Sequence, residues 1–282
     1  MPLEIRAHGR VGAEILGVDL GRPSEAELAT IRSAFADHGV VFFRDQTIDE
    51  AQHIAFARAI GPININRFFA AHPHFPEIAL VRKEVDQREN IGGGWHTDHS
   101  YDVEPALGSV LVARELPPQG GATAFASMVA AYDALPGHLR AQVDNARAVH
   151  SARHVFGSKA VVYAATTETQ NDGRVGNASA ADALGDVIHP VVITHPLSGR
   201  RALYVNPGFT TAIVGLTPED SHALLDALYA HALDPRFQET FHWAPGSVAL
   251  WDNRATWHYA HNDYHGYRRE MHRITIEGVA LH

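Results

Sequence analysis

The sequence predicts a mainly β protein with flanking helices, whose antiparallel strands form a β-sandwich or jelly roll. Short apolar or alternating runs of strand length recur along the 282 residues. They do not alternate regularly with amphipathic helices, as a parallel βαβ sheet would require. There is no internal repeat, and no change of composition marks a linker. We therefore expect one domain over residues 1–282.

The N-terminal third is expected to be scaffold. Its predicted elements, in order, are two short strands within residues 3–20, a helix over 24–38, a strand at 40–43 and a helix over 47–60. Ser24, followed three residues later by Glu27, forms a capping-box pattern at the start of the first helix. Gly61-Pro62 is a stop signal for the second helix. Residues 63–76 are expected to be irregular.

Strands dominate the rest of the chain. Predicted strands lie at 77–85, 107–116, 122–125, 191–194, 202–205, 237–243, 247–251 and 272–277, and predicted helices at 128–143 and 217–233. Pro136-Gly137 should interrupt the first of these helices, and residues 197–200 form the turn of a hairpin. Residues 151–185 are longer than an ordinary connection, so we expect a lid inserted in the domain or a partly disordered segment there.

Composition limits the classes of function. The net charge is −9, from 23 Lys+Arg against 32 Asp+Glu, and there is no basic run, so nucleic acid and anionic membranes are poor partners. The absence of cysteine excludes disulfides, zinc–thiolate sites, iron–sulfur clusters and thiol nucleophiles. The first residues lack a signal-peptide pattern, and no apolar run approaches ~18 residues. We expect a soluble, cytoplasmic protein.

The stretch from Trp95 to Tyr101 carries the first half of a possible metal site. His96 and Asp98 are two residues apart, so on extended backbone their side chains share one face. An imidazole and a carboxylate on one face are two thirds of the 2-His-1-carboxylate triad that holds non-haem Fe(II). The spacing alone is not specific, because the triplet His261-Asn262-Asp263 repeats it in a polar loop where we expect solvated side chains.

The second half lies near the C-terminus, where His258 follows an apolar strand and Arg269 comes eleven residues later. A facial triad leaves adjacent positions on iron that a 2-oxo acid can chelate through its keto and C1 carboxylate oxygens. The far carboxylate of 2-oxoglutarate then needs a fixed bidentate cation, which a guanidinium provides better than an ammonium. Arg273 should face the same way as Arg269, because the two are separated by two strand repeats.

Three stretches resemble one known family. They are W-H-T-D at 95–98, N-P-G-F-T-T-A-I-V at 206–214 and W-D-N-R-x-T-x-H-Y-A at 251–260. From about Val40 to Gly278 the chain resembles the taurine dioxygenase (TauD/TfdA-like) family of Fe(II)/2-oxoglutarate-dependent dioxygenases, which have an antiparallel double-stranded β-helix, or jelly-roll, core. The resemblance implies these residue roles: iron ligands His96, Asp98 and His258, 2-oxoglutarate carboxylate groups Arg269 and Thr123, and substrate-anion group Arg273.

The same resemblance suggests residues for the substrate pocket. The candidates are His72, Phe75, Gly92, Tyr101 and Phe209. Taurine dioxygenase itself typically has a tyrosine where we align Phe75 and an asparagine where we align Gly92. Both changes remove polar groups that would meet a small zwitterion, and a site without such groups cannot insist on a polar partner. Taurine is therefore not the expected substrate, although Arg273 still favours an anionic one.

The predicted activity is hydroxylation of a small anionic organic substrate, such as a sulfonate, sulfate ester or carboxylate, with succinate and CO2 as co-products. Oxidation within the same family can also end in desaturation, cyclisation or isonitrile formation, and the sequence does not separate these outcomes. A non-catalytic metal-binding jelly roll would be expected to lack Thr123 and Arg269. A zinc hydrolase is disfavoured because no H-E-x-x-H motif is present. The family suggests a homo-oligomer, either a dimer or a tetramer.

Overall fold

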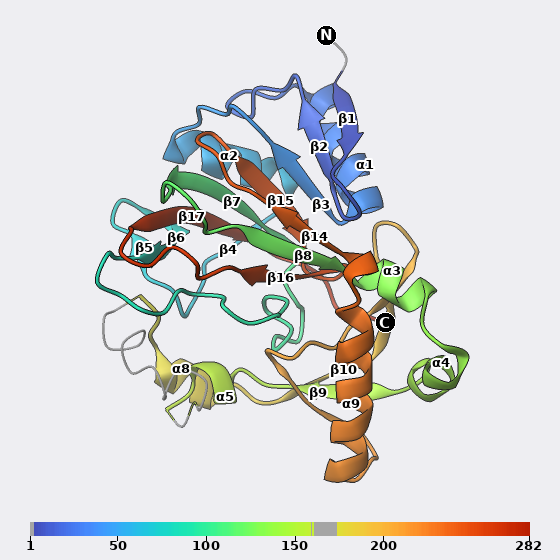
Figure 1. Cartoon of the computed structure of the whole chain (residues 1–282). Helices are drawn as coiled ribbons and strands as arrows, with labels where there is room; N and C mark the ends of the chain where they lie inside the picture. The colour runs from blue at the N-terminus through green and yellow to red at the C-terminus, as the bar shows by residue number, and fades with distance from the viewer. Residues whose placement is uncertain (1–2, 159, 161–173) are drawn as a thin grey trace.

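Two β-sheets face one another in the computed structural model, which describes residues 3–158, 160 and 174–282 (Figure 1). From edge to edge the larger sheet runs β1 (Glu4–Ala7), β2 (Ala13–Leu16), β3 (Val40–Phe43), β15 (Val248–Asp252), β7 (Gly108–Glu115), β17 (Arg269–Ile276), β6 (Phe75–Lys83) and β5 (Ala71–His72), with β4 (Ile63–Asn64) on β17. The smaller sheet runs β14 (Gln238–Phe241), β8 (Thr123–Ser127) and β16 (Thr256–Ala260). Of these pairings, β2 with β3 is parallel and the others are antiparallel.

The space between the two sheets is filled by apolar side chains. Phe42 of the larger sheet stacks on Phe241 of the smaller one, with ring centroids 4.1 Å apart and planes 4° from parallel. Leu111, Phe125 and Met271 are buried in the same cluster. Alternation along each strand sends one set of side chains into this layer and the other set to the opposite face. The expected antiparallel sandwich is confirmed.

Two helices cover the outer face of the larger sheet, α1 (Glu25–His38) and α2 (Glu50–Ile60) (Figure 1). The predicted capping box of α1 is present, because Ser24 accepts from the backbone of Glu27 and the Glu27 side chain accepts from the backbone of Ser24. The second helix starts later than predicted. Asp49 and Gln52 form its reciprocal capping box, so the helix begins at Glu50 and the N-cap residue Asp49 is extended.

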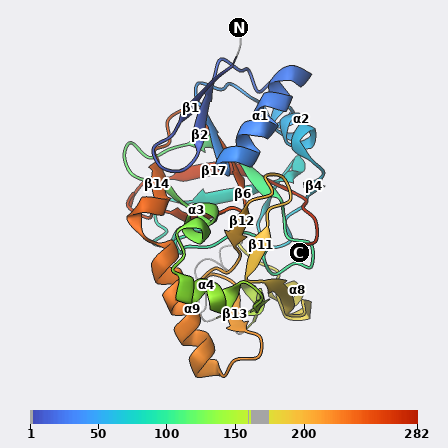
Figure 2. The ribbon, with the colours of Figure 1, turned by 90° about the vertical axis from the view of Figure 1, so that its right-hand side faces the viewer.

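Most of the chain between β8 and β14 forms a third region (Figure 2). Its elements are α3 (Met128–Asp133), α4 (Gly137–Val143), β9 (Arg147–His150), α5 (Arg153–Phe156), α8 (Ala178–Ala183), β10 (Val187–Pro190), β11 (Val192–Thr194), β12 (Arg201–Leu203), β13 (Thr210–Ile213), α9 (Pro218–Ala232) and the 3-10 turn η1 (Pro235–Phe237). The predicted hairpin is formed by β11 and β12. Part of the predicted lid, residues 159 and 161–173, lies outside the described residues.

Two element boundaries differ from the sequence expectation in ways that affect the site. β6 begins at Phe75 and not at Glu77, so Phe75 and Pro76 belong to a strand and not to a loop. β17 begins at Arg269, which places both Arg269 and Arg273 on one strand, as the alternation argument requires. No helix among the described residues has the length and apolar character needed to cross a membrane.

Candidate active site

A short antiparallel bridge brings the two predicted metal-binding histidines together. The backbone N–H of His258 donates to the carbonyl of His96 at 2.8 Å, and the N–H of His96 donates back at 3.2 Å. His258 lies on β16, whose direction is set by the preceding turn. There the buried Arg254 guanidinium donates from Nε and Nη2 to Asp252, at 2.9 and 2.6 Å. The W-D-N-R part of the motif is thus a structural support for His258.

His96, Asp98 and His258 present their ligand-type atoms to one point, with all of these atoms within 4.8 Å of one another. The Asp98 carboxylate lies 3.7 Å from His96 Nε2 through Oδ1 and 3.8 Å from His258 Nε2 through Oδ2. His96 Nδ1 lies 2.7 Å from the carbonyl of Gly94, to which its N–H can donate. That bond fixes the tautomer whose Nε2 lone pair faces Asp98, as is usual for metal-bound histidine. Two nitrogens and one oxygen suit a divalent transition metal such as Fe(II).

The charges around this group also suit a metal. Burial lowers the pKa of His96, and burial together with the neighbouring His96 lowers the pKa of His258 well below its ordinary value. Burial alone would raise the pKa of Asp98, but the Arg273 guanidinium and the neighbouring histidines together outweigh it and hold the pKa below its ordinary range. Arg273 Nη1 donates to the two Asp98 oxygens at 3.2 and 3.1 Å. Neutral imidazoles and an ionised carboxylate are the protonation states that metal binding needs.

A second buried arginine stands beside this group, next to Thr123. Only about 5% of the Arg269 surface is exposed, and its Nε has no hydrogen-bond partner within the described part of the chain. The indole of Trp243 donates to Thr123 Oγ1 at 2.9 Å, which leaves the Thr123 hydroxyl hydrogen for another acceptor. The Arg269 guanidinium carbon lies 5.9 Å from the Trp243 ring centroid. A bound carboxylate would satisfy both donors.

The turn before β8 packs directly on Arg269. A Cβ added at Gly121 would lie 3.1 Å from Cδ and Nε of Arg269, and Gly121 has φ +68°, so this position requires glycine. The backbone N–H of Gly121 donates to Asp263 Oδ1 at 2.7 Å. Asp263 is exposed, as expected of a polar loop, but it also has a structural role. Its carboxylate holds the turn that covers Arg269.

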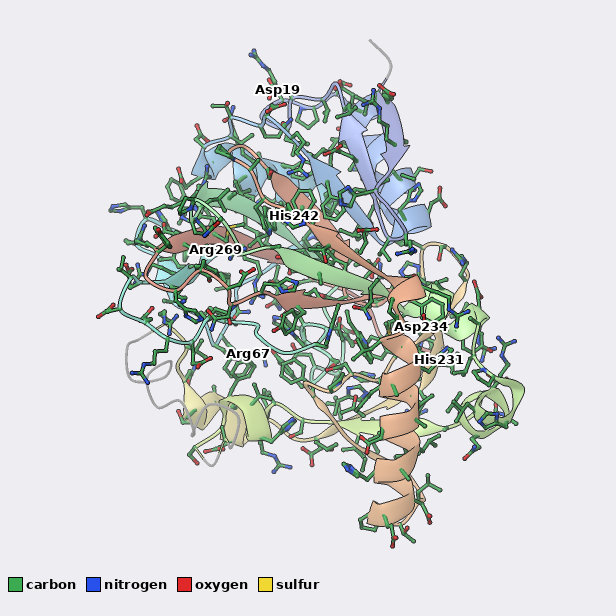
Figure 3. The ribbon with its side chains drawn as sticks, in the orientation of Figure 1. Asp19, Arg67, His231, Asp234, His242 and Arg269 are labelled. Carbon is green, nitrogen blue, oxygen red and sulfur yellow. The ribbon has the colours of Figure 1, made fainter. Side chains whose placement is uncertain are left out.

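The three candidate metal ligands, Thr123 and the two buried arginines line a cavity of about 370 Å³. Polar parts of its wall are the candidate metal ligands His96, Asp98 and His258, together with Thr123, Arg269 and Arg273. Much of the rest is apolar. The Phe69 ring lies over the Arg273 guanidinium, 4.4 Å from centroid to carbon. The loop that carries Phe69 runs below the sheets, where Arg67 is labelled in Figure 3, whereas Arg269 lies at the level of the sheets. Apolar lining residues from other segments are Ile91, Val155, Phe156, Pro207 and Phe209.

The predicted substrate residues do not all reach this cavity. Gly92 and Phe209 line it, and Tyr101 packs behind Phe209 with ring centroids 4.8 Å apart. His72 and Phe75 are not among the residues that line it, and they face each other across the β5–β6 pair. Phe75 packs against the core under α1 and α2, and Val81 is the β6 residue at the cavity wall.

Sequence reasoning also missed Phe69, Val155 and Phe156. They come from loops and a four-residue helix, and no periodic pattern marks them.

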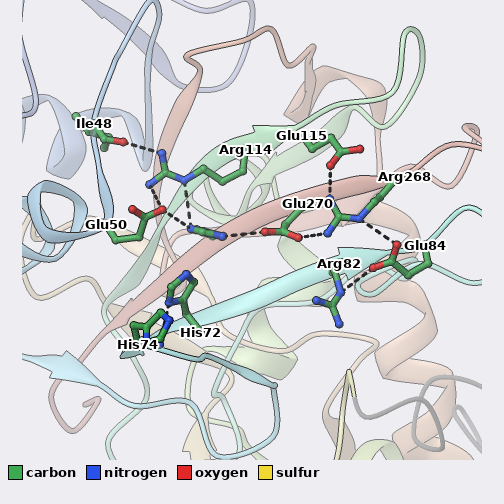
Figure 4. Close-up of polar contacts among 11 residues, drawn as sticks. Ile48, Glu50, His72, His74, Arg82, Glu84, Arg114, Glu115, Arg268 and Glu270 are labelled. Carbon is green, nitrogen blue, oxygen red and sulfur yellow. Dashed lines mark hydrogen bonds and ion pairs between the residues drawn. The ribbon is translucent and has the colours of Figure 1, made fainter.

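A second group of two histidines and one carboxylate lies on the outer side of the larger sheet (Figure 4). It consists of Glu50, His72 and His272, with His272 Nδ1 3.6 Å from Glu50 Oε1. The guanidinium of Arg114 stands between them. Its Nε donates to His272 Nδ1 at 3.2 Å, and its Nη2 lies 3.4 Å from Glu50 Oε1. The lone pair that would bind a metal is therefore already used, and an arginine holds the position of the cation.

Known proteins resemble this chain over nearly its whole length. Residues 4–275 match the family model "Taurine catabolism dioxygenase TauD, TfdA family". An alpha-ketoglutarate-dependent sulfate ester dioxygenase of Pseudomonas putida is 35% identical over 98% of this chain and 90% of its own length. A (S)-phenoxypropionate/alpha-ketoglutarate-dioxygenase of Sphingobium herbicidovorans is 34% identical, with 88% and 85% covered. A crystal structure of a taurine dioxygenase from Burkholderia xenovorans superposes with a TM-score of 0.81 at 34% identity, covering 99% of this chain and 92% of that one.

Proposed function

This chain belongs to the taurine catabolism dioxygenase TauD, TfdA family, and we propose that it uses Fe(II), 2-oxoglutarate and O2 to hydroxylate an anionic substrate with an apolar body. The observation that carries the proposal is the group of His96, Asp98 and His258 at the wall of a cavity that also contains Arg269 and Arg273. A metal site, a place for a dicarboxylate and a second guanidinium are thus present in one enclosed space.

His96 and His258 would bind the iron through Nε2, and Asp98 through one carboxylate oxygen. The carbonyl of Gly94 orients His96, and Arg273 keeps Asp98 ionised and directed at the histidines. Bound Fe(II) supplies the activation of O2 that couples oxidative decarboxylation of a 2-oxo acid to hydroxylation of a substrate. The protein supplies a fixed arrangement of donors and a wall that limits access of water.

Arg269 and Thr123 would hold the C5 carboxylate of 2-oxoglutarate. Both are buried, and both have donor capacity that the described protein groups leave unused. A guanidinium can donate two parallel hydrogen bonds to a carboxylate, which fixes its orientation as well as its position. Held at that end, the 2-oxo acid group of the co-substrate can extend toward His96 and His258.

Arg273 would bind the anionic group of the substrate. It contacts the candidate metal ligand Asp98, and its Nε and Nη2 have no hydrogen-bond partner among the described residues. Phe69 covers its guanidinium, and Phe156, Phe209 and Ile91 give the rest of the space an apolar wall. Such a lining favours an alkyl or aryl group joined to a sulfate ester, carboxylate or sulfonate over a small zwitterion. An anion bound at Arg273 would bring the adjacent carbon toward His96, Asp98 and His258, since Arg273 contacts Asp98.

The proposal is tested by an anaerobic titration. Fe(II) and 2-oxoglutarate are added to the apo-protein, and the weak visible charge-transfer band of the chelate is expected to appear. Candidate alkyl sulfates, aryloxy carboxylates and sulfonates are then screened for a shift of the band, and product masses distinguish hydroxylation from desaturation or cyclisation. Bound iron without a band would contradict the proposal and favour a non-catalytic or hydrolytic metal protein.

A further inference from the structure

Lys83 is a buried amine that the proposed site does not use. It lies on β6 directly opposite Arg269 on β17, where the two residues are Cα partners in the antiparallel register. Only about 1% of its surface is exposed, and Nζ has no hydrogen-bond partner within residues 3–158, 160 and 174–282. Opposite residues of an antiparallel pair have side chains on one face with Cβ atoms about 5 Å apart. Lys83 therefore lies beside Arg269, the proposed carboxylate clamp, on the neighbouring strand.

A tyrosine ring connects the two cations. Lys83 Nζ lies 4.5 Å from the ring centroid of Tyr264, and the Arg269 guanidinium carbon lies 6.0 Å from the same centroid. Tyr264 is itself buried, at about 3% exposure. The negative π-face of a tyrosine attracts a cation more strongly when water is excluded. Lys83 and Arg269 thus lie against the same buried ring.

The charges around Lys83 are mostly positive. Arg174 is buried nearby and donates from Nη1 to the carbonyls of Arg82 and Glu89. Glu89 lines the cavity and is the acidic group that acts on Lys83. Burial lowers the pKa of the Lys83 amine, an effect that Glu89 opposes and Arg174 reinforces. Buried cations without a paired anion are costly, and a bound dicarboxylate would remove part of that cost.

We propose that Lys83 is a positioning residue for 2-oxoglutarate: it holds Tyr264 against Arg269 and adds a second positive charge beside the guanidinium that binds the C5 carboxylate. This inference rests on the proposed function, because it assumes that Arg269 binds that carboxylate. The new element is that part of the affinity for 2-oxoglutarate comes from Lys83, a residue that does not line the cavity. Lys83 is one of only two lysines in a chain with 21 arginines, so this position departs from the chain's general use of arginine.

Kinetics of three variants test the proposal. Lys83→Met keeps most of the side-chain volume and should raise the KM for 2-oxoglutarate by about tenfold, the effect of removing one cation within about 10 Å of a bound carboxylate. The substrate KM should stay within about twofold, and Lys83→Arg should restore most of the 2-oxoglutarate affinity. Arg82→Met is the matched control, because Arg82 precedes Lys83, points to the other face and pairs with Glu84 at 3.0 Å.

The dissociation constant of 2-oxoglutarate, read from the anaerobic chelate band, separates the two hypotheses. A band in the unaltered chain with the same constant in Lys83→Met would overturn this inference and leave the proposed function standing. No band in the unaltered chain would overturn both. Lower thermal stability of Lys83→Met with unchanged 2-oxoglutarate affinity would make Lys83 a structural residue only.

A second measurement does not depend on the variant folding. In protein labelled with 13C and 15N lysine, only two lysine side chains give signals, and Lys159→Arg identifies the one from Lys83. Zn(II) with 2-oxoglutarate should shift the Lys83 signal, and the shift should be lost in Arg269→Gln. An unmoved Lys83 signal at saturating 2-oxoglutarate would overturn the proposal.

Discussion

Among its described residues the molecule has two groups of two histidines and one carboxylate, on opposite faces of the larger sheet. An arginine lies beside each, but the two arginines act differently. Arg273 contacts only the carboxylate of its group, at 3.1 Å, and leaves both imidazole nitrogens facing a common point. Arg114 contacts both the imidazole and the carboxylate of the other group. Two clusters with the same residue types thus differ in the position of the nearby cation, and we expect that position to decide which of them can bind a metal.

Orientation distinguishes the two groups as well. His96 uses Nδ1 on the carbonyl of Gly94 and keeps Nε2 directed at Asp98. His272 uses both nitrogens within the protein, with Nδ1 accepting from Arg114 and Nε2 3.1 Å from Glu270. Its neighbours continue into a chain of ion pairs through Arg268 to Glu84 and Glu115 (Figure 4). His272 and Glu50 of the outer group are thus paired within the protein, whereas both Nε2 atoms of the inner group remain available as metal ligands.

Removal of one carboxylate from each group should give the largest difference between them. Asp98→Ala should lower turnover by about 1,000-fold or more, because it removes a proposed metal ligand and with it several kcal/mol of metal-derived stabilisation. Glu50→Ala, the matched change in the outer group, should keep turnover within about twofold. Turnover and iron content per chain are the measurements. Equal loss in both variants would contradict the assignment of roles to the two groups.

Sequence reasoning located the inner group because its members are few and their spacing is constrained. Strand alternation places Arg269 and Arg273 on one face of β17. His96 and Asp98 are two residues apart, but their spacing became informative only through the family resemblance, because Asp98 lies in a turn and not on a strand. Reasoning from the residues also found the capping box of α1 and the hairpin of β11 and β12. Local rules suffice where the relation is between near neighbours.

The same reasoning failed where distant segments meet. The resemblance places His72 and Phe75 in the pocket, but His72 on β5 packs edge-on to His272, with ring centroids 5.4 Å apart, and Phe75 packs against the core under α1 and α2. Phe69 and Phe156 form part of the wall and have no local signal. Asp263 in a polar loop gave no hint that it holds the turn over Arg269. These contacts depend on tertiary packing, which no periodicity encodes.

The two arginines of the inner site should separate in a second test. Arg269→Gln should raise the KM for 2-oxoglutarate by about 100-fold, since a charge-assisted bidentate contact contributes about 2–3 kcal/mol. Arg273→Gln should act mainly on the KM of the anionic substrate, with a smaller effect through Asp98. Steady-state kinetics with each substrate varied in turn provide the measurement. If Arg273→Gln alone raises the 2-oxoglutarate KM, the roles of the two arginines are reversed.

Low pH should lower the free energy of unfolding through a buried histidine of α2. His53 is fully buried there, and burial, reinforced by Arg114, lowers its pKa from 6.5 to about 3. A proton then binds the unfolded chain more readily than the folded one, so His53 costs no stability above pH ~6.5 but progressively more as the pH falls toward 3. His53→Leu should recover about 2 kcal/mol at pH 5 relative to pH 7.5, measured by urea unfolding at both values. An equal difference between variant and wild type at both pH values would contradict this.

The comparison of the two groups is tested most directly by taking Arg114 away. Arg114→Met should free His272 Nδ1 and Glu50 from their cation, leaving two imidazoles and a carboxylate within 4.8 Å of one another. We expect this variant to bind one more Zn(II) than the unaltered chain, with a gain in unfolding free energy of about 1.4 kcal/mol at ten times the dissociation constant. Isothermal titration and thermal unfolding with and without Zn(II) measure both quantities.

The double variant Arg114→Met/His72→Ala is the control and should lose the added site. If Arg114→Met binds no additional metal, then geometry and not the resident guanidinium keeps the outer group from binding a cation. The contrast between the two groups would then lie in how far their ligand atoms can approach one another.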